Sequence, residues 1–235
     1  MPSSRSEHPQ LQYEQKPEVK QLLGDNHSYI RGNIATRGPC PGLNALANQG
    51  YLPRDGNNIT LSEVETALMS ALHMDKPLAS ALTNSLKPLL HKDKTFNLVD
   101  MRQHNIIEHD VSFTRLDFRQ GDNYTFQPPM FQALLADANG GPVTVKSLAK
   151  TYVRRRKESK AAGSPGLSIN LWFVNLLQSV SLLNTAATGG KLSRELMVTF
   201  YTEERFPEEV LRNEKPRTLF GLVGNALLLL FYTFF

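Results

Sequence analysis

Apolar residues recur at helical intervals along most of this chain, and that periodicity constrains its fold more than any other feature. Leu61, Val64, Leu68 and Leu72 fall on one face of a helix, directly after the Thr-x-x-Glu pattern of a capping box that begins at Thr60. No segment shows the strict alternation typical of a half-buried strand. The sequence therefore predicts an all-α fold. Further helices are expected after Pro77 and over residues 131–138, 147–160, 168–187 and 193–204.

Two long stretches, residues 44–58 and 95–123, are rich in polar, glycine and histidine residues and separate the predicted helices. Long irregular segments in a compact helical domain are usually functional or disordered. A chain of 235 residues with 40% hydrophobic content is long enough for one domain with a sizeable core. The expected organisation is a polar, flexible segment at 1–25, a single helical domain at 26–217 and an apolar C-terminal segment at 218–235.

The two ends of the chain bear on its location. The N-terminus contains no apolar run, so no secretory signal peptide is expected and the chain is predicted to be intracellular. Residues 218–235 carry no charge, and their length is at the short edge of a membrane span. The same segment would serve equally well as a buried terminal helix. The sequence thus leaves two alternatives open, a cytoplasmic protein and one that associates with a membrane through this tail.

Charge and cysteine content exclude some classes of protein. The net charge of +4 is mild and gives no reason to expect a nucleic-acid partner. The basic run at residues 154–157 lies in a predicted helix and is interpreted as a solvated helix face rather than a phosphate-binding patch. A single cysteine, Cys40, excludes an internal disulfide and is compatible with a reducing compartment.

Cys40 lies in the most informative stretch of the sequence. Pro39 and Pro41 flank it, and Pro41 suits the first position of a helix that runs through Leu43 and Leu46. Cys40 would then be the N-cap residue, where the free backbone N–H groups and the helix dipole favour a negative charge. Both effects lower a thiol pKa and predict a functional thiolate. A nucleophile, a redox sensor and a metal ligand remain open on spacing alone, as does a free buried cysteine.

Two motifs carry a resemblance to a known family. The first is Pro-Cys-Pro-Gly-Leu-Asn at residues 39–44, which Gly-Tyr-Leu-Pro-Arg-Asp-Gly follows at 50–56. The second is Glu-His-Asp-Val-Ser at 108–112, with Gly-Asp-Asn at 121–123. Together, and with Glu-Glu-Arg-Phe-Pro at 203–207, they resemble the fungal haem-thiolate peroxidases, the family of chloroperoxidase and the short unspecific peroxygenases. The resemblance extends over about residues 35–215.

The resemblance implies a cofactor site. Cys40 matches the axial ligand of a haem b iron, within the cofactor-binding turn that Pro39 and Pro41 frame. A thiolate ligand favours cleavage of the O–O bond of a peroxide. Glu108, His109 and Ser112 match positions by a haem propionate, and the resemblance implies that they help to bind Mg²⁺ or Mn²⁺ there. Hard oxygen ligands suit such cations. Asp110 matches a residue that orients the histidine.

The distal side departs from the family pattern. There the resemblance implies that His109 pairs with a glutamate from a later helix, which moves the peroxide proton. The helix at 168–187 contains no acidic residue, and the best match to that glutamate is Gln178. A glutamine can hydrogen-bond peroxide but cannot carry a proton. Three hypotheses follow: His109 acts alone, the site serves another reaction, or the protein is a weakened haem-binding pseudoenzyme.

The function implied by the resemblance is oxidation of a small organic metabolite with hydrogen peroxide, in a role that fits fungal secondary metabolism. The rival classes are the pseudoenzyme and a thiolate redox sensor without haem. Apolar side chains should line the substrate channel, although side chains of this kind occupy ordinary core positions more often than channel walls. The candidates are Phe113, Leu171, Val174 and Val180.

Overall fold

The computed structural model describes residues 27–234, so the predicted flexible segment at 1–25 lies outside the described residues. Within them the fold is helical, as the periodicity predicts. The helices are α1 (Pro41–Asn48), α2 (Leu61–Leu72), α3 (Lys76–Asn84), α4 (Pro128–Asp137), α5 (Val145–Ala161), α6 (Ile169–Ala186), α7 (Arg194–Glu203), α8 (Glu208–Leu211) and α9 (Leu219–Phe234). Short 3₁₀ turns occur at Ile34–Thr36, Lys87–Leu89, Leu98–Arg102 and Phe118–Gln120.

Four short strands form two antiparallel pairs that the sequence did not predict. β1 (Ile59–Thr60) pairs with β2 (Thr95–Phe96), and β3 (Val143–Thr144) pairs with β4 (Lys191–Leu192). Each strand has two residues. Two residues are too few to show an alternating pattern, so no sequence signal for them exists. Each pair instead joins the chain just before one helix to a distant loop.

Side-chain caps fix where the predicted helices begin. Thr60 Oγ1 accepts a hydrogen bond from the Glu63 amide at 3.2 Å, and Glu63 Oε2 accepts one from the Thr60 amide at 2.8 Å, which confirms the capping box. Ser168 caps α6 and Ser193 caps α7 by accepting from the amide three residues on. The loop expected at 44–58 begins later than predicted, because α1 continues to Asn48.

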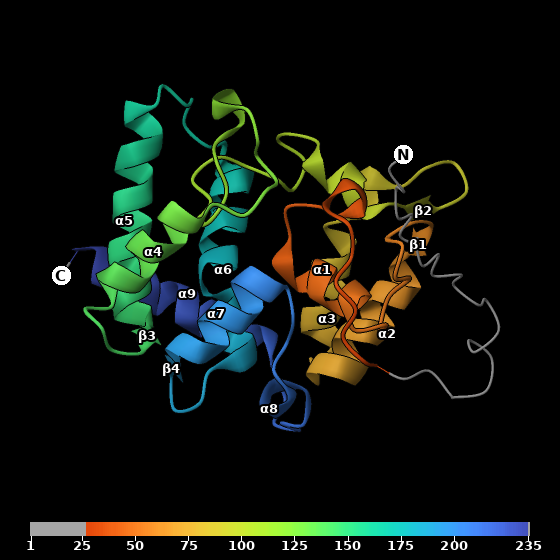
Figure 1. Cartoon of the computed structure of the whole chain (residues 1–235). Coiled ribbons are helices and arrows are strands. Elements are labelled where there is room, and N and C mark those ends of the chain that lie inside the picture. The colour runs from red at the N-terminus through yellow and green to blue at the C-terminus, as the bar shows by residue number, and fades with distance from the viewer. Residues whose placement is uncertain (1–26, 235) are drawn as a thin grey trace, which may run out of the picture.

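Figure 1 shows how the helices divide around the centre of the molecule. Helices α1, α2 and α3 gather on one side, α4, α5, α6 and α9 gather on the other, and α7 lies between them. One cluster of buried apolar side chains runs through both sides. The long segment between β2 and α4 crosses from one side to the other, and it carries the second sequence motif.

The C-terminal segment forms helix α9, which packs against α5 and α6. Leu222, Ala226 and Leu229 are its buried side chains and recur at helical spacing. Among the described residues, every helix falls short of the length and apolar content that a membrane span needs. Helix α9 is apolar on both of its faces: one face is buried, and the other is exposed.

The basic run at 154–157 is not uniformly solvated, and the prediction is wrong for Arg155. Arg155 is 4% exposed and lies on the inner face of α5, at helical spacing from buried Tyr152 and Ser159. Its guanidinium donates to Asp117 Oδ1 at 3.1 Å. A run of four cations along a helix necessarily places one of them inward when the helix is packed on one side.

Candidate active site

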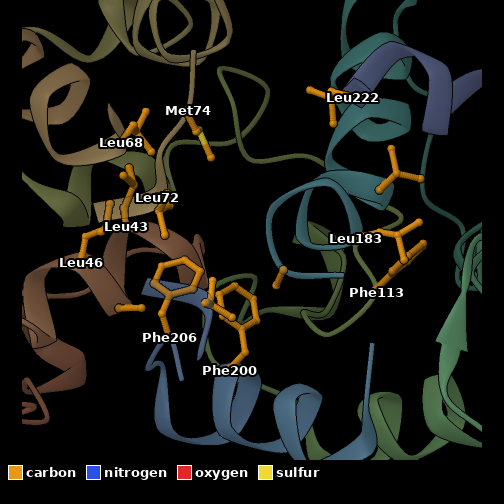
Figure 2. Close-up of a cluster of buried hydrophobic side chains, with 14 of the residues drawn as sticks. Leu43, Leu46, Leu68, Leu72, Met74, Phe113, Leu183, Phe200, Phe206 and Leu222 are labelled. Carbon is orange, nitrogen blue, oxygen red and sulfur yellow. The ribbon is translucent and has the colours of Figure 1, made fainter. Parts of the chain in front are cut away.

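A cavity lies between the two sides of the fold and collects most of the residues that the two motifs supply. The space among its lining residues is about 1420 Å³, which includes its opening to solvent. Much of the wall is apolar. Figure 2 shows the contributing side chains: those of α1 and α2 on one side, Phe200 and Phe206 below, and Phe113 opposite. Pockets for organic ligands are usually of this kind, apolar with a few convergent polar groups.

Cys40 is the N-cap residue of α1, as predicted, and it is partly exposed because it lines the cavity. The predicted lowering of its pKa by the helix start is present, but it is not the largest effect on the thiol. Burial raises the pKa of the thiol, and this effect exceeds the lowering by the backbone amides of Leu43 and Gly42 and by the Arg115 charge. The helix start therefore favours the anion but does not outweigh desolvation. A metal ion would supply the missing charge, since a coordinating thiol is deprotonated outright.

Buried amides fix the position of the cysteine turn. Asn44 Nδ2 donates to the Gly38 carbonyl at 2.9 Å, and Asn44 Oδ1 accepts from the Gly38 amide at 3.2 Å. Asn48 Oδ1 accepts two hydrogen bonds from the Arg37 guanidinium, at 3.1 and 2.8 Å. Arg37, Asn44 and Asn48 are each 1% exposed. The turn around Cys40 is thus held by a satisfied polar network rather than by packing alone.

A buried ion pair beside Cys40 was not predicted from the sequence. Arg115 lines the cavity, and its Nη2 lies 3.4 Å from Glu204 Oε1. Glu204 Oε1 also accepts from Asn44 Nδ2 at 2.8 Å. Burial raises the pKa of Glu204, while Asn44 and Arg115 lower it. The only sequence signal was the family-like segment at 203–207, which gave no hint of its partner 89 residues away.

Tyr201 belongs to the same wall of the cavity. Its ring packs against Phe131, with ring centroids 5.4 Å apart, and its hydroxyl group is buried. Burial raises the pKa of Tyr201 to about 12, the neighbouring Arg115 cation opposes this, and the phenol stays neutral over the physiological range. It therefore adds a neutral polar group to the wall that carries Cys40.

The second motif forms a loop that a buried carboxylate supports. Asp117 is fully buried, and its Oδ1 accepts from the Val111 amide at 2.9 Å and from Arg155 at 3.1 Å. Its Oδ2 accepts from the Ser164 hydroxyl at 3.0 Å. Val111 adopts a left-handed conformation with φ +71°, which a β-branched residue rarely does without such restraint. The loop bearing the predicted site residues is therefore held in a strained form by Asp117.

His109 presents a free nitrogen in the cavity. Its Nδ1 lies 2.7 Å from the Asp110 carbonyl oxygen, which can only accept, so Nδ1 carries the proton and Nε2 of the neutral ring carries a lone pair. Nε2 is buried and has no hydrogen-bond partner among the described residues. Burial lowers the pKa of the imidazole, and this outweighs the opposing effects of the Asp110 carbonyl and of Gln178, which lies near the ring without meeting the geometry of a hydrogen bond to Nε2. Asp110 therefore orients the histidine through its backbone carbonyl group and not through its side chain. The Asp110 carboxylate accepts a hydrogen bond from the Phe118 amide at 2.8 Å.

Gln178 lies on α6 and faces the cavity, where it is exposed and close enough to His109 to affect the pKa of the ring. Asn175, one turn earlier, also lines the cavity and donates to the Val111 carbonyl at 3.4 Å. Among the described residues, Glu108 is the one acidic side chain in the cavity wall, and it lies 2.7 Å from His104 Nδ1. No carboxylate on α6 therefore accompanies His109.

The predicted site residues fall into two groups. Those that line the one cavity are Pro39, Cys40, Pro41, Glu108, His109, Ser112, Phe113 and Gln178. Leu171 and Val174 do not line it: they share the helix face of Gln178, at seven and four residues before it, but lie nearer the start of α6, and Val180 is fully buried in the core. Across residues 27–234 no three His, Cys, Asp or Glu side chains cluster closely enough to hold a metal ion by themselves.

Comparison with known proteins agrees with this arrangement. The sequence model described as peroxidase, family 2, matches residues 27–215. An aromatic peroxygenase of Coprinellus radians is 29% identical over 206 residues, which is 75% of this chain and 78% of the relative. A chloroperoxidase of Leptoxyphium fumago is 32% identical over 143 residues, which is 54% of this chain and 38% of the relative. A dothistromin biosynthesis peroxidase of Dothistroma septosporum is 31% identical over 150 residues, which is 53% of this chain and 35% of the relative.

The chain thus spans most of one peroxygenase but well under half of the chloroperoxidase and the biosynthesis peroxidase. The matched region contains both motifs, the loop that Asp117 supports and the helix that carries Gln178. Its fold is the all-α single domain that the resemblance implies. From the family match along residues 27–215, this chain belongs to peroxidase family 2, the haem-thiolate peroxidases.

Proposed function

We propose that this protein is a haem-thiolate peroxidase that uses hydrogen peroxide to oxidise a small organic molecule. The observation that carries the proposal is that Cys40 and the unpartnered Nε2 of His109 line the same cavity, although they come from motifs about 70 residues apart. A thiol at a helix start and a neutral imidazole with a free lone pair are the two groups that peroxide chemistry needs from the protein. The relatives named as peroxygenase, chloroperoxidase and peroxidase support the same activity.

Membership of the family implies a haem cofactor, and the cavity fits one. Its wall is largely apolar, and it leaves a buried imidazole nitrogen without a partner. We assign the group as haem b, with Cys40 Sγ as the protein ligand of its iron and the Gly42 and Leu43 amides beside the sulfur. A thiolate-ligated haem supplies the cleavage of the peroxide O–O bond.

A divalent cation, Mg²⁺ or Mn²⁺, would have to share its ligands with the cofactor. Glu108 and Ser112 contribute a carboxylate and a hydroxyl group to the cavity wall, which are ligand types that such cations prefer. The described residues offer too few donors for an all-protein site. A propionate and water oxygens would complete the coordination. We therefore propose the cation as a companion of bound haem rather than as an independent site.

The protein contributes a proton carrier on the distal side. His109 Nε2 can accept a proton from peroxide, and the Asp110 carbonyl holds the ring by Nδ1 while it does so. The same nitrogen can return the proton to the departing oxygen. Gln178 can donate a hydrogen bond through its amide but cannot take part in this transfer. Turnover is then slower than a histidine–glutamate pair would allow.

The substrate class follows from the cavity wall. Phe113, Phe200 and Phe206 and the leucines of α1 and α2 favour an apolar or aromatic molecule over a charged one. The cavity wall has the fewest polar side chains on the side of α2 and the most around residues 108–115. Phe113 belongs to the same motif as His109, so an aromatic ring that contacts Phe113 would lie on the side of the cavity that carries His109.

The rival function is a haem-binding pseudoenzyme, which Gln178 favours. A substitution of His109 separates the two. The haem-reconstituted His109→Phe variant should oxidise an aromatic substrate with peroxide about 10²–10⁴ times more slowly than the wild type, with haem content unchanged. His91→Phe is the matched control, since His91 is 43% exposed in its side chain and lies outside the cavity wall. A wild-type rate no higher than that of free haem would establish the pseudoenzyme, and an unchanged His109→Phe rate would remove His109 from the mechanism.

A further inference from the structure

Helix α9 exposes a continuous apolar stripe on its outer face. Phe220 is 88% exposed, Leu227 is 62% exposed and Phe234 is 80% exposed. Val223 and Leu228 add to the same face at 41% and 48%. Phe220, Val223, Leu227 and Phe234 are spaced by three, four or seven residues, so they lie above one another along the helix, and Leu228 lies beside Leu227. Single exposed apolar side chains are ordinary, but a contiguous stripe of this kind marks an interaction surface.

Lysines border this stripe on the neighbouring helix α5. Lys146 Nζ lies 5.9 Å from the ring centroid of Tyr232 on α9. Lys150 and Lys157 line a shallow hollow with the same tyrosine. All three lysines are exposed, and none forms an ion pair among the described residues. The positive charge beside the stripe is therefore available to a partner.

The acidic groups near these lysines are already engaged. Glu158 accepts from Arg154 at 2.8 Å and from Arg155 at 2.7 Å, and Asp137 accepts from Arg154 at 2.9 Å. The lysine side of α5 thus keeps its net positive charge. An apolar helix face with a cationic border is the pattern of a helix that lies in the plane of a membrane interface. Anionic headgroups would pair with the lysines while the aromatic and leucine side chains enter the acyl boundary.

We propose that helix α9 docks this protein onto an anionic lipid surface, lying in the interface rather than spanning the bilayer. A second copy of the chain fits the surface less well. A two-fold dimer would pair this face with its own copy, and because α9 carries no acidic residue, the copy's α9 would offer the lysines no opposite charge. The inference does not depend on the haem site.

Vesicle binding tests the proposal with the full chain. The wild type should sediment with vesicles of phosphatidylserine and phosphatidylcholine and bind phosphatidylcholine vesicles more weakly. Replacing Lys146, Lys150 and Lys157 together by Gln should lower the partition coefficient for the anionic vesicles by about 100-fold, since each lysine contributes a factor of about five. The variant Phe220→Ser/Leu227→Ser should reduce binding to both vesicle types by at least about tenfold.

The control is a pair of exposed apolar residues far from α9. Ile30 and Ile34 are 57% and 47% exposed, and the variant Ile30→Ser/Ile34→Ser should bind vesicles as the wild type does. Far-ultraviolet circular dichroism of each variant establishes that helix content is retained. Equal binding to charged and neutral vesicles, or unchanged binding by the α9 variant, overturns the proposal. The proposal is also overturned if the wild type binds no vesicles but forms a concentration-dependent dimer that the α9 variant does not form.

Discussion

Gln178→Glu is expected to raise the rate of peroxide-dependent oxidation by about 10²–10⁴-fold, because it restores a group that can carry a proton beside His109. Gln178 lines the cavity and already influences the pKa of the imidazole, so a carboxylate at this position would lie within reach of His109. Its charge would also favour the protonated ring, which permits His109 and Glu to act as a pair. The measurement is the initial rate with peroxide and an aromatic substrate at equal haem content.

A carboxylate placed elsewhere on the same helix separates this mechanism from a general effect of charge. Ser181 lies on α6 and lines the same cavity three residues beyond Gln178. The variant Ser181→Glu is expected to leave the rate within a small factor of the wild type. If both variants raise the rate equally, the effect is electrostatic and not proton transfer. If Gln178→Glu binds haem normally but reacts no faster, Gln178 is not the position of the missing acid.

The second large effect concerns stability. Asp117→Ala is expected to lower the free energy of unfolding by about 3–5 kcal/mol, because it leaves the buried Arg155 charge and the Val111 amide without their acceptor. Asp117 is fully buried, so solvent does not screen its interactions in the folded protein. Urea denaturation followed by circular dichroism measures the change, and an unchanged denaturant slope would show that the unfolded state is unaffected.

A partly exposed ion pair that joins α4 to α5 provides the control. Asp137→Ala removes an acceptor of Arg154 and of the Thr151 hydroxyl, but Arg154 keeps Glu158 at 2.8 Å and Thr151 keeps the Ser147 carbonyl at 3.3 Å. Its cost should be about 1 kcal/mol. Asp117→Ala should also weaken haem binding, because the strained loop of His109 depends on it, whereas Asp137→Ala should not. Equal costs for the two variants would mean that the Asp117 network does not support the loop.

Local signals in the sequence predicted the fold well. Thr60, Ser168 and Ser193 cap the helices that their positions predict, and Pro41 begins the helix that makes Cys40 its N-cap residue. Each of these features depends on residues within about four positions of one another, which is the range that a helix start requires. The two strand pairs left no such trace, since they join residues far apart in the chain.

The parts of the site that lie within one short motif could be predicted from the sequence. The parts that fold together from distant segments could not. Cys40 and His109 were each identified from their own motifs, and the structure brings both to one cavity. The Arg115–Glu204 pair joins residues 89 positions apart, and no pattern in the sequence relates them. The direction of the Cys40 pKa could not be predicted for the same reason. The helix start is a local feature, but the burial that outweighs its effect on the pKa comes from the whole fold.

The central claim is that Cys40 holds a haem iron through sulfur, and the spectrum of the reduced protein under carbon monoxide tests it most directly. The haem-reconstituted wild type is predicted to show the red-shifted Soret band of thiolate-ligated haem. The variant Cys40→His, in which an imidazole can still bind iron, should retain haem and lose that band. A wild-type spectrum without the band, or one that Cys40→His leaves unchanged, would contradict the account.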